Sequence, residues 1–90
     1  MVTVTERAAS ELTAQLLALT SDPEIGLRLL PAIGGGFLLI LDTEQSGDQV
    51  VEHQGSKVLL IGIEYRRALE GYTIDCYDTP EGAVLFVREG

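Results

Sequence analysis

The chain has 90 residues, of which 46% are hydrophobic and 22% are charged, and its mean hydropathy is +0.21. This length suits one domain with one core, and the composition is too apolar for an intrinsically disordered chain. Fourteen acidic residues against six basic ones give a net charge of −8, which is the wrong sign for binding phosphate backbones or anionic lipid. We therefore expect a single domain over residues 1–90 that binds neither nucleic acid nor membranes.

Cysteine usage and the N-terminal sequence indicate a compartment. One cysteine cannot close an intramolecular disulfide and cannot by itself hold a zinc ion or a cluster. No apolar run approaches the length of a membrane span, and the first residues lack the pattern of a signal peptide. These features predict a cytoplasmic protein.

The first predicted elements are a short extended segment and a helix. Val2 and Val4 alternate with threonines, and Thr5 is a suitable N-cap. Apolar residues then recur at helical spacing as far as Leu19, and the residue before Pro23 avoids the α region, so the helix ends near Thr20.

Short strand segments follow, separated by glycine, proline and aspartate clusters at the spacing of antiparallel connections. We expect strands at Ile25–Leu30, Phe37–Asp42, Gln49–His53, Lys57–Ile61, Tyr72–Tyr77 and Ala83–Arg88. The stretch from Ile63 to Glu70 has helical spacing before Gly71 and predicts a second, short helix. The expected class is α+β, with short, mostly antiparallel strands packed as a small sandwich or barrel and the first helix lying across it.

Two of these strands, Phe37–Leu41 and Val58–Ile61, are apolar at every position instead of at alternate ones. Such a strand needs cover on both faces, because an exposed face would leave a large apolar patch. A second sheet or another chain would supply the cover, and the strands therefore favour a partner surface.

The glycine run Gly34-Gly35-Gly36 is the most unusual local feature. It lacks the lysine and Ser/Thr of a P-loop and the spacing of a dinucleotide-binding loop. We interpret it as a tight bend between strands, and the alternative is a loop that contacts a ligand.

Cys76 and His53 are the only thiol and the only imidazole. We interpret Cys76 as a small buried apolar residue and His53 as a solvated residue at a strand end. The alternative for both is metal ligation, and Cys76 also has a redox alternative.

No set of residues supplies a nucleophile, a base and an orienting group together, so we expect no enzymatic activity. No serine lies in a G-x-S-x-G elbow, and the carboxylates form no dyad. Loop carboxylates such as Glu44 and Asp48 are interpreted as solvated charges, and Arg66-Arg67 as an exposed positive face.

Taken in order, the segments resemble the HesB-like family of iron–sulfur cluster biosynthesis proteins, which are the A-type scaffolds and carriers. The similar stretches span nearly the whole chain. They are the opening Val2–Ala9, the strand Ile25–Leu29, the turn Gly34–Phe37, the strand Gly55–Gly62, the stretch Leu69–Cys76 and the strand Glu81–Phe86. The resemblance implies the sandwich form and a tendency to form homodimers.

The chain departs from the family pattern at the positions of the family's iron or cluster ligands. The resemblance implies iron or cluster ligands at a cysteine in the glycine-rich turn and at a C-terminal C-x-C. Here the turn has only Gly34 to Gly36, and the sequence stops at Gly90, where the cysteine tail would begin. Cys76 falls at an aromatic core position of the family, so no family ligand carries over.

We therefore expect no cofactor, and an iron–sulfur cluster is implied only by the resemblance. The predicted function is that of a divergent, non-enzymatic relative of cluster assembly proteins that acts through protein contacts as a homodimer. The alternative is a small-ligand or metal-binding module that uses the Gly34–Gly36 loop, with His53 or Cys76 as ligands.

Overall fold

The computed structural model describes residues 1–90 as two helices and two β-sheets. The helices are α1 (Glu6–Leu19) and α2 (Ile63–Ala68). The strands are β1 (Thr3–Val4), β2 (Ile25–Pro31), β3 (Phe37–Thr43), β4 (Gln49–His53), β5 (Ser56–Ile61), β6 (Tyr72–Thr79) and β7 (Gly82–Glu89). The α+β class and each expected helix and strand are confirmed.

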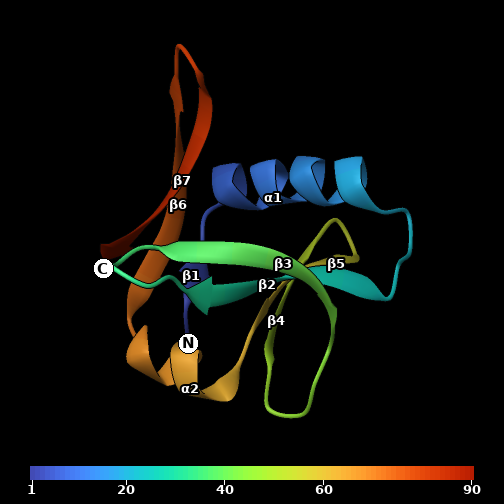
Figure 1. Ribbon diagram of the computed structural model, residues 1–90, viewed down its shortest axis with the longest axis horizontal. Coiled ribbons are helices and arrows are strands. Elements are labelled where there is room, and N and C mark those ends of the chain that lie inside the picture. Colours follow the sequence, from blue (N-terminus) through green and yellow to red (C-terminus); the bar gives the residue numbers. More distant parts are fainter.

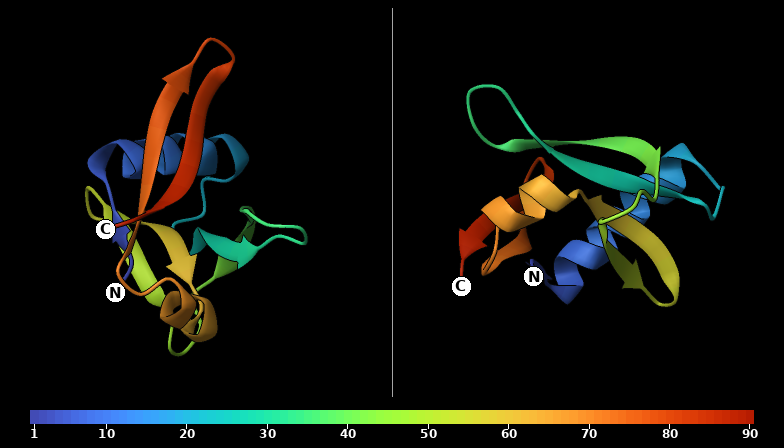
Figure 2. Two further views of the ribbon diagram at one scale, coloured as in Figure 1. Left: turned by 90° about the vertical axis from the view of Figure 1, so that its left-hand side faces the viewer. Right: turned by 90° about the horizontal axis from the view of Figure 1, so that it is seen from below.

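The strands form a four-stranded sheet in the order β3-β2-β5-β4 and a three-stranded sheet in the order β1-β6-β7. Most neighbours are antiparallel, as expected. Two pairs that the local sequence does not predict, β2 with β5 and β1 with β6, are parallel. The hairpin of β6 and β7 stands at one end of the molecule and extends past α1 (Figures 1 and 2).

Helix α1 begins at the expected cap and covers the core. The Thr5 hydroxyl accepts a hydrogen bond from the Ala8 amide at 3.1 Å and donates one to Asp75 Oδ1 of β6 at 2.8 Å. The buried face of α1 packs against both sheets. The core comprises Val2, Ala8, Leu12, Leu16, Leu27, Leu29, Val58, Leu59, Ile61, Ile74 and Cys76.

The two strands that are apolar throughout have different surroundings. Val58–Ile61 of β5 lies in the middle of its sheet and is buried, as expected. Strand β3 lies at the edge, and Leu38, Ile40 and Leu41 are 44%, 43% and 43% exposed. A single chain therefore leaves the apolar strand β3 half uncovered.

Candidate functional site

The glycine run forms the turn between β2 and β3, which projects from the body of the molecule (Figure 2). All three glycines have positive φ angles, 89°, 110° and 73°, so this backbone favours glycine. The Ala32 amide donates to the Gly36 carbonyl and the Gly35 amide to the Ala32 carbonyl, each at 3.2 Å. The bend between strands is confirmed, and the three glycines supply no side-chain donor for a metal.

Cys76 lies within β6 and is 8% exposed, as a member of the core. The pKa of its thiol is raised mainly by burial; the nearby Arg7 charge partly opposes this effect, and nearby carboxylates add to it. A raised pKa disfavours the thiolate, which is the nucleophilic and metal-binding form. The interpretation of Cys76 as a small buried residue therefore agrees with its position.

The interpretation of His53 as a solvated residue is wrong. Its side chain is only 10% exposed, and Nδ1 lies 3.6 Å from Glu6 Oε1 at the start of α1. The sequence does not show this burial, because β4 is brought against α1 by the tertiary fold.

These three features do not converge. Gly34–Gly36 are in a projecting turn, Cys76 is in the core and His53 ends β4 beside α1. No group of three or more His, Cys, Asp or Glu side chains is arranged to hold a metal ion. The structure thus offers no assembled metal site at the predicted candidates.

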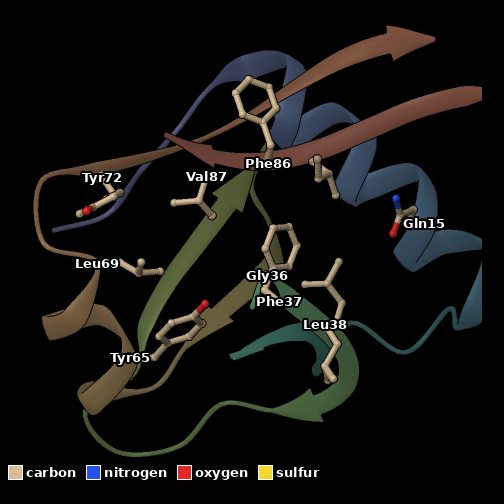
Figure 3. A pocket seen from close by; sticks show the side chains of 11 residues that line it. Gln15, Gly36, Phe37, Leu38, Tyr65, Leu69, Tyr72, Phe86 and Val87 are labelled. Carbon is tan, nitrogen blue, oxygen red and sulfur yellow. The ribbon is translucent and has the colours of Figure 1, made fainter. Parts of the chain in front are cut away.

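The concave feature of this region is an apolar cleft of about 800 Å³ between the edge strands β3 and β7, closed at one side by α2. Figure 3 shows side chains from these elements around a common space. We call this feature the β3–β7 cleft; it is lined by Gln15, Gly36, Phe37, Leu38, Leu39, Tyr65, Leu69, Tyr72, Leu85, Phe86 and Val87. None of these side chains is charged.

Sequence reasoning misses the β3–β7 cleft, because its walls come from segments nearly 50 residues apart that belong to different sheets. The available signal was the uninterrupted apolar run Phe37–Leu41, which predicts a partner surface on β3. Gly36 is one of the lining residues, so the end of the glycine turn borders the cleft.

In the four-stranded sheet, Arg28 of β2 lies at the centre of a network of charged side chains. The Arg28 guanidinium contacts Asp48 through two hydrogen bonds, of 3.0 and 2.7 Å, and Asp42 through one of 2.5 Å. It also donates to the Thr43 carbonyl at 3.2 Å. The side chain of Asp48 is 2% exposed, so its interpretation as a solvated charge is wrong.

This network sets the protonation of its members. Hydrogen bonding to Arg28 is the main reason that the pKa values of Asp42 and Asp48 lie below their ordinary value, and the pKa of Arg28 is raised by the same contacts. Every donor nitrogen of Arg28 has a partner, and no buried polar side-chain atom of the chain lacks one. The network therefore pins the loop 44–48 to β2.

The remaining arginines lie on the surface. Arg66 donates to the Gly47 carbonyl at 3.0 Å, and Arg67 is exposed.

The structure contains no helix with the length and apolar character required to traverse a bilayer.

Solved structures with this arrangement of elements include two proteins linked to iron–sulfur clusters. Escherichia coli SufA, described as involved in the biosynthesis of iron–sulfur clusters, superimposes with a TM-score of 0.75 at 22% identity over 98% of this chain and 84% of SufA. IscA, solved with a [2Fe–2S] cluster, superimposes with a TM-score of 0.65 at 19% identity over 99% of this chain and 85% of IscA.

The chain has the fold of SufA and IscA. The predicted resemblance to the HesB-like family is confirmed at this level of the fold. No protein-family model and no curated protein matches the sequence. The likeness is therefore carried by the three-dimensional arrangement and not by sequence identity.

Proposed function

We propose that this chain is a non-enzymatic, cytoplasmic relative of the iron–sulfur cluster assembly proteins that acts through protein contacts as a homodimer. The relation to such proteins rests on the fold that the chain shares with SufA and IscA. The contact role rests on the half-exposed apolar strand β3 and the uncharged β3–β7 cleft beside it.

The donor set supports a role without a resident cluster. Proteins hold iron–sulfur clusters mainly through cysteine thiolates, commonly four of them. The glycine-rich turn, where the resemblance implies a thiolate, carries Gly34–Gly36 and no donor side chain. The one cysteine of these 90 residues is in the core. The residues present do not fit a cluster, and no chemical step is assigned to one.

The observation that carries the proposal is the combination of the SufA-like fold with a turn that lacks the thiolate. A protein with this fold could bind the same partner proteins as a cluster carrier without binding an iron–sulfur cluster. The apolar run of β3 begins directly after this turn, so the turn and the contact surface are adjacent.

Quantitative affinity purification from the native host tests the contact role. The tagged chain is compared with the Ile40→Lys and Leu38→Lys variants, which place charge on β3 and keep the core unchanged. We expect the wild type to enrich proteins of iron–sulfur cluster assembly, identified by mass spectrometry, and the variants to lose them. Recovery of none of these proteins with the wild type would contradict the proposal.

A further inference from the structure

We propose that the β3–β7 cleft binds an extended segment of a partner protein, which adds as a strand to the free edge of β7 and carries a basic residue at each of its ends. Alternate apolar side chains of this segment enter the cleft. The occupant is taken to be part of a protein because of the contact role proposed above, and the inference rests on the proposed function in that respect alone.

The backbone of β7 offers hydrogen bonds at its free edge. The Gly90 amide donates to the Gly71 carbonyl at 3.3 Å, and hydrogen-bonded and non-hydrogen-bonded pairs alternate along an antiparallel ladder. By this alternation, Val87 and Leu85 lie in non-hydrogen-bonded pairs, and their backbone groups point away from β6. The Ile74 carbonyl, opposite Val87, accordingly accepts its hydrogen bond on the β1 side. The amides and carbonyls of Leu85 and Val87 are thus available to a further strand.

Strand β3 presents a second free edge to the same cleft. The Ala32 amide donates to the Gly36 carbonyl, so the same alternation turns the backbone groups of Phe37 and Leu39 away from β2. Pro31, which has no amide, stands opposite Phe37, as a non-hydrogen-bonded position allows. Both edges are long and regular, so backbone geometry alone does not select between β3 and β7.

Charge distinguishes the two edges. Strand β7 has a free carboxylate at either end, because Glu81 precedes it and Glu89 is its last residue, and both are exposed and outside every ion pair. Arg88, the one cation of β7, is paired with a carboxylate of β6 at 3.2 Å. Asp42 and Glu44, near the end of β3, are already paired with basic side chains. A segment with basic ends therefore finds free partners along β7, and the net charge of −8 attracts it.

The cleft accepts apolar side chains at alternate positions of the added strand. Side chains that face each other across paired strands lie on the same side of the sheet, so those opposite Leu85 and Val87 share the side of these two residues. Figure 3 shows Val87 directed toward Phe37 and Tyr65. The lining on this side is uncharged and encloses about 800 Å³. Strand addition commonly combines these two features, because backbone hydrogen bonds give affinity and pockets for alternate side chains give specificity.

Hydrogen exchange of the purified chain, followed by NMR, tests the site. The probe is a peptide of about nine residues with blocked termini, in which valine and threonine alternate between a lysine at each end. At saturation, the Leu85 and Val87 amides should exchange at least about tenfold more slowly, because each gains a hydrogen bond. The Phe86 amide, which faces β6, is the internal reference and should change little. Absence of binding at millimolar peptide, or protection confined to Phe37 and Leu39 of β3, would overturn the proposal.

Charge variants test the selection of β7. Glu81→Gln combined with Glu89→Gln should weaken binding of the lysine-ended peptide on the order of tenfold. Glu24→Gln combined with Glu52→Gln is the matched control, because both residues are exposed, lie outside β7 and give the same change of charge. Equal losses in the two double variants, or equal affinity for a peptide with glutamate ends, would refute the choice of a basic segment.

These measurements need only the purified chain and a peptide, so they separate this site from the proposed function. If the peptide does not bind, the proposed contact with cluster assembly proteins can still be made through another surface. If the peptide binds at β7 and the affinity purification recovers no assembly protein, the strand-addition site stands and the proposed relation to cluster assembly is lost.

Discussion

Single residues decide how firmly the loop beside the four-stranded sheet is held. Arg28 is buried, and its charge is balanced by Asp48 and Asp42. Removal of one member of a buried ion pair leaves the other charge without compensation, which typically costs 3–5 kcal/mol. The network therefore accounts for a buried arginine in a strand whose neighbours are apolar.

We predict that Asp48→Ala lowers the free energy of unfolding by about 3 kcal/mol, at the low end of the usual range because Asp42 remains bonded to Arg28. Urea unfolding measures this difference. Asp78→Ala is the control, since Asp78 pairs with Arg7 on the surface and should cost less than about 1 kcal/mol. Equal losses in the two variants would contradict a structural role for the buried network.

The same carboxylates predict how stability depends on pH. The folded pKa values of Asp42 and Asp48 lie below the ordinary value of 3.8, so the folded state binds fewer protons than the unfolded state near that pH. Their stabilisation is complete above the ordinary value and is lost as the pH falls through the depressed values. The urea midpoint should thus hold down to about pH 5 and drop below about pH 4. A smaller acid-induced drop in Asp48→Asn would tie the effect to this network, and an unchanged drop would refute that origin.

Cys76 should be chemically inert in the folded protein. Its thiol is buried, and its pKa is raised by that burial. We expect reaction with an aromatic disulfide reagent to be at least about tenfold slower in buffer than in urea. Ser56→Cys in a Cys76→Ala background is the exposed comparison, because Ser56 begins β5 at the surface. Native Cys76 reacting as fast as that variant would show that the thiol is accessible.

Among the elements, the Thr5 side chain links the start of α1 to β6. Thr5 caps the helix and also donates to Asp75, whose pKa is lowered mainly by the Cys76 amide and then by this hydroxyl. Thr5→Ala should cost about 1 kcal/mol in the free energy of unfolding, whereas Thr5→Ser keeps a hydroxyl and should cost a few tenths. Thermal or urea unfolding of both variants distinguishes them. If serine and alanine were equally destabilising, the cap would have no role.

The elements themselves could be read from the sequence, because their signals are local. Gly71 and the glycine run mark chain reversals, Thr5 marks a helix start, and the apolar spacing differs between α1 and the strands. The order in which the strands pair in the sheets could not be predicted from such local signals. The parallel pairing of β2 with β5 depends on segments about 30 residues apart, and no short-range pattern specifies it.

The candidate site was predictable only in part. The apolar run Phe37–Leu41 indicated a partner surface, but the cleft itself needs β7 and α2 to be placed beside β3. The prediction that Asp48 is solvated was wrong because its partner Arg28 is 20 residues away in the sequence. The prediction that His53 is solvated was wrong because α1, in a distant part of the chain, covers its side chain.

The whole molecule has the fold of SufA and IscA at 22% and 19% sequence identity. The glycine turn offers backbone and no sulfur, and the apolar strand that follows it is uncharged and half exposed. These two properties are the basis of the proposal that the chain contacts other proteins without holding a cluster.

Anaerobic reconstitution with iron and sulfide tests whether this chain can hold a cluster, with IscA, which was solved with a [2Fe–2S] cluster, treated in parallel as the positive control. After removal of unbound metal, iron and sulfide are quantified per chain, and the charge-transfer absorption of sulfur-bound iron is recorded. We predict that IscA retains a cluster and that this chain retains well under one iron atom per polypeptide. A stoichiometric cluster on this chain, stable to gel filtration, would contradict the proposed role without a resident cluster.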